Sequence, residues 1–131
     1  MFILDELKYT EEHIWVRPDG EDMVTIGLTD YAQSELSEIL YIELPNEGDD
    51  IIANEPFGSV ESTKSEVVDL YAPLSGKVID ANVEVINDPT LVNNAPYTEG
   101  WLIRVKVYEK NELDSLLSAD DYEEYLADFS E

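Results

Sequence analysis

The residues most suited to chemistry surround Lys64. A polar turn of residues 62–65 separates two segments that are rich in strand-forming residues, so the lysine stands alone at the tip of a predicted hairpin. At pH 7 an amine with a pKa of about 10.4 is mostly protonated, but an enzyme that deprotonates it can join it to an activated carboxylic acid as a neutral amide. A lysine in a polar turn is ordinarily a solvated side chain. This position is also one that a modifying enzyme can reach without unfolding the chain.

Other side chains that could do chemistry lack the spacing that chemistry needs. Lys77, Lys106 and Lys110 have no comparable turn and are interpreted as surface charges. His13 is the one histidine, and because no partner residues accompany it, we interpret it as structural or surface-exposed. The chain has no cysteine, which excludes a thiol nucleophile and thiolate metal sites. Paired acids such as Glu11 and Glu12 indicate a solvated face, so we predict no catalytic residue and no metal site.

The elements that position Lys64 are short predicted strands separated by turns. Val and Ile residues alternate with polar ones, and Pro, Gly, Asn and Asp punctuate them, which is typical of a small sandwich or barrel. The predicted strands cover residues 8–28 as a hairpin, then 39–44, 51–53, 57–61, 67–71, 77–85 and 101–108. Residues 87–100 are predicted to form a loop.

Three short helices are also predicted. Thr29 is a suitable N-cap for a helix that continues through Glu38, and Ser118 is a suitable N-cap near the C-terminal end. Apolar residues recur at helical spacing among acids towards that end, which indicates two amphipathic helices that close one end of the sandwich. These apolar residues are Leu113, Leu116, Leu117, Tyr122, Tyr125, Leu126 and Phe129.

Composition limits the class of protein. A chain of 131 residues is the size of one domain, and we expect a single domain over residues 1–131. Hydrophobic residues make up 44% of the chain, too many for a disordered acidic chain. Acidic residues number 31 against seven basic ones, and the formal charge of -24 argues against nucleic acid and membrane partners. We therefore expect a monomer whose partners are other proteins.

The chain shows no sign of export or membrane insertion. Residues 1–8 lack the basic start and apolar run of a signal peptide, and no stretch approaches the roughly 20 apolar residues that span a bilayer. We expect a bacterial cytoplasmic protein, or a mitochondrial matrix protein if the chain is a mature eukaryotic form.

Together, the residues around Lys64 resemble the lipoylation turn of the H proteins of the glycine cleavage system. Residues 61–65 and the downstream Tyr71-Ala72-Pro73-Leu74-Ser75-Gly76 carry this likeness. Further segments resemble the family in the same order along nearly the whole chain: residues 7–16, 26–33, 42–45 and 96–103.

The resemblance implies a fold and a function. H proteins adopt a mostly β fold, the barrel-sandwich hybrid of lipoyl and biotinyl carriers, here with a short internal helix and C-terminal helices. They are not enzymes: they carry lipoate on the tip lysine, which corresponds to Lys64, and shuttle an aminomethyl group and electrons in glycine catabolism and one-carbon metabolism. The implied partners are glycine decarboxylase (P protein), aminomethyltransferase (T protein), dihydrolipoamide dehydrogenase (L protein) and a lipoate ligase or lipoyltransferase. The residues expected to be recognised around Lys64 are Glu61, Ser62, Thr63, Ser65 and Asp69.

Two features depart from the family's usual pattern. Ile14 stands where H proteins usually have a Glu that helps to hold the loaded arm, and the segment from Lys64 to Pro73 is one residue longer than usual. The alternative function that these differences suggest is an H-like lipoate relay or donor for other lipoyl-dependent enzymes. Biotin carriers usually place Met on both sides of the lysine, whereas Thr63 and Ser65 stand here, which favours lipoate.

Overall fold

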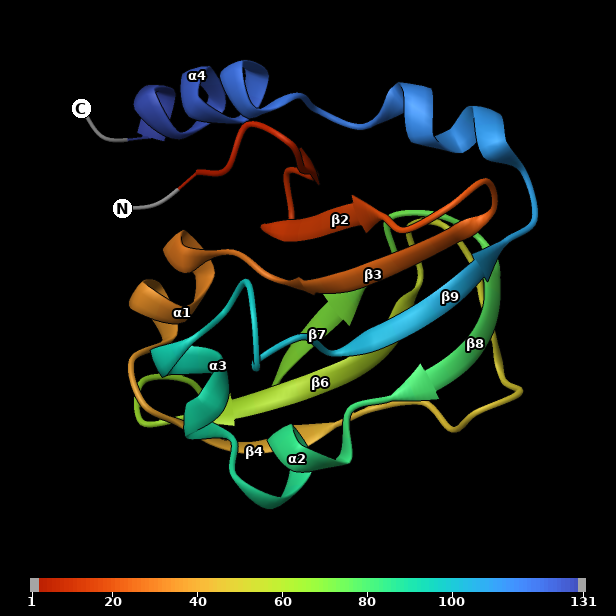
Figure 1. Cartoon of the computed structure of the whole chain (residues 1–131). Helices are drawn as coiled ribbons and strands as arrows, with labels where there is room; N and C mark the ends of the chain where they lie inside the picture. Colours follow the sequence, from red (N-terminus) through yellow and green to blue (C-terminus); the bar gives the residue numbers. More distant parts are fainter. Residues whose placement is uncertain (1–2, 130–131) are drawn as a thin grey trace.

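A computed structural model describes residues 3–129, which form two packed β-sheets with helices at their ends (Figure 1). One sheet has six strands in the order β1-β2-β3-β9-β8-β5, and the other has three in the order β4-β6-β7. All neighbouring strands are antiparallel. The strands are β1 Lys8–Tyr9, β2 Ile14–Pro18, β3 Met23–Leu28, β4 Ile39–Glu43, β5 Asp50–Ile51, β6 Pro56–Ser62, β7 Val68–Tyr71, β8 Gly76–Ala81 and β9 Ile103–Val107.

One hydrophobic core lies between the two sheets. Alternation along the strands turns Ile42, Val60 and Leu70 of the three-stranded sheet inward, where they pack in one cluster with residues of the six-stranded sheet such as Ile26 and Val105. Each of these side chains is at most 3% exposed. The predicted mostly β sandwich is confirmed, and the strand pairing of the described residues leaves both sheets open.

The helices flank this sandwich, and none of them within residues 3–129 is long and apolar enough to cross a membrane. They are α1 Asp30–Leu36, α2 Val83–Asn87, α3 Thr90–Asn94, the 3₁₀ helix η1 Lys110–Ser115 and α4 Ala119–Phe129. Both predicted caps are confirmed: Thr29 Oγ1 accepts a hydrogen bond from Ala32 N at 3.2 Å, and Ser118 Oγ accepts one from Asp121 N at 3.1 Å. The first C-terminal helix is 3₁₀ rather than α, and the side chain of Phe129 lies outside the described residues.

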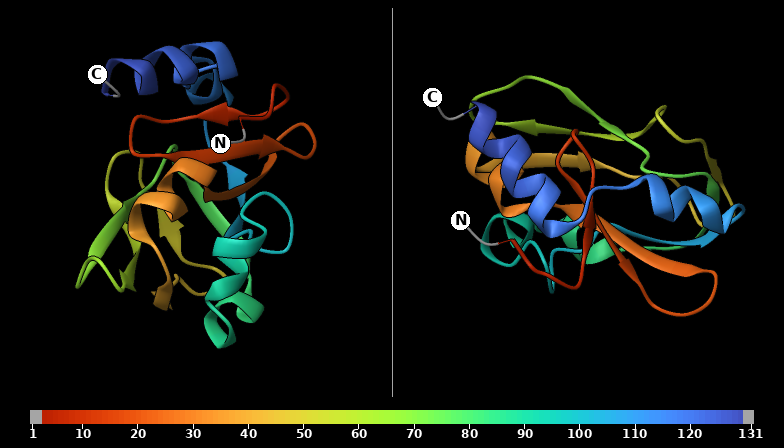
Figure 2. Two further views of the ribbon diagram at one scale, coloured as in Figure 1. Left: turned by 90° about the vertical axis from the view of Figure 1, so that its left-hand side faces the viewer. Right: turned by 90° about the horizontal axis from the view of Figure 1, so that it is seen from above.

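A second apolar cluster joins α4 to β1 and β2, and α4 lies beside these two strands (Figures 1 and 2). The rings of Tyr9 and Tyr122 stack with centroids 4.6 Å apart, and Trp15 is fully buried with Nε1 donating to Pro96 O at 3.0 Å. Gly27 lies directly against the Trp15 ring, where an added Cβ would come within 2.6 Å of the ring carbons. Burial of Trp15 therefore requires a glycine on the neighbouring strand.

The prediction was wrong for residues 82–94. The predicted strand over residues 77–85 ends at Ala81, and both α2 and α3 replace the expected strand end and loop. Asn82 explains the change, because its Oδ1 accepts from Glu84 N at 3.1 Å while its Nδ2 donates to Glu99 O and Trp101 O. These bonds cap a helix and tie it to a distant segment, which overrides the strand preference of Val83 and Val85.

Candidate functional site

Lys64 lies at the exposed tip of the loop between β6 and β7. The loop lies at the same end of the molecule as α1 and α3 (Figure 1). Both Thr63 and Lys64 are exposed, whereas Ser62 is only 6% exposed beneath them. The structure thus presents the amine to solvent on a loop whose base is buried.

Ser62 holds this loop together. Its Oγ accepts hydrogen bonds from the backbone N–H groups of Lys64 at 3.3 Å and Ser65 at 3.1 Å, and its own N–H donates to Ser65 O at 2.9 Å. A further bond, from Thr63 N to Glu38 O at 3.0 Å, attaches the loop to the segment after α1. The backbone under Lys64 is therefore fixed by bonds that do not involve the lysine side chain.

The predicted recognition residues occupy two places. Ser62, Thr63 and Ser65 form the loop with Lys64, but Glu61 and Asp69 are exposed residues of the flanking strands β6 and β7. Glu61 lies opposite Tyr41 of β4, and Asp69 lies opposite Ser59 of β6. Asp69 is thus separated from the tip by the start of β7 and belongs instead to a groove beside it.

This α1–β7 groove has a volume of about 150 Å³ and begins at Val68, the first residue of β7. Its apolar lining comes from Leu28, Ala32, Leu36, Val68 and Leu70. Its polar lining comes from Glu12, His13, Glu35 and Asp69. Such a groove suits a ligand with a hydrocarbon body and a cationic end.

Ile14 does not face this groove. Its side chain is fully buried in the main core, so the residue next to His13 in the chain contributes packing rather than charge. The carboxylates at the groove come from other positions, which sequence reasoning missed except for Asp69. Of these, Glu35 lies on the helix that begins after the predicted N-cap Thr29. Helical spacing could have placed Glu35 near the lysine loop only if the hydrogen bond from the loop to Glu38 O had been known.

His13 links the groove to α4. Its Nδ1 lies 2.9 Å from Tyr122 Oη, which in turn lies 2.9 Å from Thr29 Oγ1. Burial lowers the pKa of His13, an effect that the Glu35 carboxylate opposes, and burial also raises the pKa of the Tyr122 phenol. A neutral imidazole that accepts a hydrogen bond from a neutral phenol fits these shifts. The described residues contain no group of three or more acidic, His or Cys side chains that could hold a metal.

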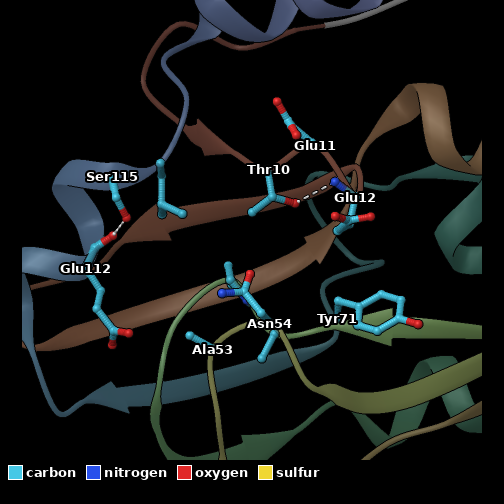
Figure 3. Close-up of a pocket in the computed structure, with 11 residues that line it drawn as sticks. Thr10, Glu11, Glu12, Ala53, Asn54, Tyr71, Glu112 and Ser115 are labelled. Atoms are coloured by element: carbon cyan, nitrogen blue, oxygen red, sulfur yellow. Dashed lines mark hydrogen bonds between the residues drawn. The ribbon is translucent and has the colours of Figure 1, made fainter.

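A second pocket, of about 230 Å³, lies between the turn before β2, the turn after β5 and η1 (Figure 3). Glu11, Glu12 and Glu112 contribute carboxylates, and Tyr71 and Asn54 form part of the wall. Glu112 Oε1 accepts a hydrogen bond from Ser75 N at 3.0 Å, which gives this acid a structural role. The pocket lies beyond Tyr71, at the end of β7 away from the lysine loop.

Comparison with known proteins gives one consistent result. Residues 7–129 match the family model described as "Glycine cleavage H-protein". The chain is 56% identical over 119 residues to the glycine cleavage system H protein of Geobacillus sp. (strain WCH70), covering 91% of this chain and 92% of that protein. It is 49% identical over 128 residues to the same-named protein of Staphylococcus carnosus (strain TM300), covering 98% and 100%. The crystal structure of a glycine cleavage system H protein from Mycobacterium marinum superposes with a TM-score of 0.84 at 32% identity, covering 98% of this chain and 100% of that one.

Proposed function

Because the chain belongs to the glycine cleavage H-protein family, we propose that it works as the lipoyl carrier of that system with lipoate attached to Lys64. The observation that carries the assignment of the residue is the loop around it. Lys64 is an exposed amine on a loop whose backbone is fixed by the buried Ser62, so a modifying enzyme meets a defined shape. The relatives' shared name does not favour the alternative of a lipoate relay.

The residues present fit a lipoyl group. Acylation of Lys64 removes one positive charge, so the formal charge changes from -24 to -25, and no bond described for the loop depends on the lysine amine. Bound lipoate supplies a disulfide that can accept an aminomethyl group and two electrons. The protein's own contribution is to hold the attachment point rigid and accessible. We propose that the chain is not itself an enzyme.

The α1–β7 groove gives the arm a resting place. Its apolar wall of Leu28, Leu36 and Leu70 would shield a hydrocarbon chain from water. The carboxylates of Glu35 and Asp69 would attract the amine of a loaded arm. On this proposal, the acids of the groove take the part that Ile14 cannot play.

We further propose the partners and setting that the family implies. These are glycine decarboxylase, aminomethyltransferase, dihydrolipoamide dehydrogenase and a lipoate ligase. The relatives described above are bacterial proteins, which supports action in a bacterial cytoplasm. The family match over residues 7–129 supports a single domain, and we propose that it acts as a monomer.

The intact mass of the protein after incubation with lipoate, ATP and a lipoate ligase tests the assignment. We expect a lipoyl-sized increment on the parent and on a Lys77→Arg control, and none on Lys64→Arg. The arginine keeps the positive charge but cannot be acylated in this way. An increment on Lys64→Arg, or no increment on the parent, would overturn the proposal.

A further inference from the structure

Positive charge is segregated between the two sheets. Lys64 is the only Lys or Arg in the stretch from β4 to β7. The other basic residues all lie on strands of the six-stranded sheet or on η1: Lys8, Arg17, Lys77, Arg104, Lys106 and Lys110. Once Lys64 is acylated, the three-stranded sheet and its loops carry no cationic side chain.

The outward surface of this sheet is both acidic and aromatic. Register places Tyr41 beside Glu61, and Glu43 and Asp69 on either side of Ser59. The residues between them point into the core, so these side chains point outward, as does Tyr71. Tyr41 is 55% exposed and Tyr71 is 37% exposed. We call this surface the hairpin face: Tyr41, Glu43, Glu61, Asp69 and Tyr71.

We propose that the hairpin face is the docking surface for the glycine-decarboxylating partner enzyme, whose active-site entrance is ringed by Lys and Arg side chains. This inference rests on the proposed function. The face is continuous with the loop of Lys64, and the arm cannot enter a partner's active site unless the partner covers the surface around its attachment point.

Charge determines which kind of surface fits. Three carboxylates with no neighbouring cation repel an acidic partner and attract a basic one, and such attraction raises the rate of encounter. The two exposed tyrosines add contact area for binding, which a purely solvated acidic surface lacks. Tyrosine is enriched where binding energy concentrates, because its ring provides a large rigid contact and its hydroxyl a hydrogen bond.

The segregation also orients the encounter. Arg104 and Lys106 face outward on the opposite sheet, so a basic partner is attracted less strongly there than at the hairpin face. The partner therefore approaches with its entrance towards the lipoyl arm rather than towards the far side of the carrier.

Charge reversal with a matched control tests the electrostatic part. The lipoylated full chain serves as the substrate of a glycine decarboxylase, and kcat/KM is measured at low and at high ionic strength. Glu43→Lys and Glu21→Lys both change the formal charge of the lipoylated chain from -25 to -23, but Glu21 lies in the β2–β3 turn, at the far end of the molecule from the lysine loop (Figure 1). We expect Glu43→Lys to lower kcat/KM about fivefold at low salt and much less at high salt, and Glu21→Lys to lower it less than about twofold.

A pair of tyrosine variants tests the contact part. Tyr41 and Tyr108 are each 55% exposed, and Tyr108 lies just after β9 of the other sheet. We expect Tyr41→Ala to raise KM about fivefold at both salt concentrations, and Tyr108→Ala to leave KM nearly unchanged.

The outcomes separate the two proposals. Equal effects of Glu43→Lys and Glu21→Lys, or a parent whose kcat/KM does not depend on salt, would overturn the docking surface while leaving the carrier function intact. A lipoylated parent that supports no glycine decarboxylation at any salt concentration would overturn the function itself. Mass measurement of each variant before the assay ensures that lipoyl loading is equal.

Discussion

Removal of the Ser62 hydroxyl should loosen the loop that presents Lys64. Ser62→Ala deletes the acceptor of two backbone hydrogen bonds, at 3.3 Å from Lys64 N and 3.1 Å from Ser65 N. Both distances are at the long end of the N–H···O range, so each bond is assigned somewhat less than about 1 kcal/mol. The sum of about 1.4 kcal/mol corresponds to a roughly tenfold rise in the population of the open loop.

Amide hydrogen exchange measures this change directly. The amides of Lys64 and Ser65 should exchange about tenfold faster in Ser62→Ala than in the parent, while amides in the centre of β6 should change little. Ser59→Ala removes a hydroxyl from the same strand and is the matched control. If the two variants gave the same exchange rates at Lys64 and Ser65, the idea that Ser62 fixes the loop would be wrong.

Two further predictions concern Gly27 and His13. Gly27→Ala should lower the free energy of unfolding by about 2 kcal/mol in urea titration, because the new methyl meets the Trp15 ring, whereas Gly20→Ala should change it by less than about 0.5 kcal/mol. For His13, burial holds the pKa below the ordinary value of 6.5, so its stabilisation is complete above pH 6.5 and is lost as the pH falls through the folded-state pKa. His13→Gln should therefore lose less unfolding free energy than the parent on acidification below pH 6.5, and an equal loss in the two proteins would refute this assignment.

Local patterns sufficed for much of the fold. Thr29 and Ser118 cap their helices through bonds to residues three positions away. Both partners of each bond therefore lie in one short stretch of sequence. Alternation along the chain likewise predicted the strands on both sides of Lys64 and the exposed loop between them. The prediction failed at Val83 because bonds to Glu99 and Trp101, which belong to a segment that no local pattern can place, hold Asn82 in its capping position, although the cap bond from Glu84 N is itself local.

The sequence by itself determined the family, the mostly β architecture and the lysine most suited to modification, because these depend on residue types and short spacings. Only the tertiary structure decided which acids share a surface with that lysine. Glu12 and Glu35 reach the groove, and Tyr41 and Glu43 reach the hairpin face, through strand register and helix packing. Register depends on interactions between residues far apart in the chain, so a one-residue slip of β4 would turn Tyr41 and Glu43 to the opposite face of the sheet.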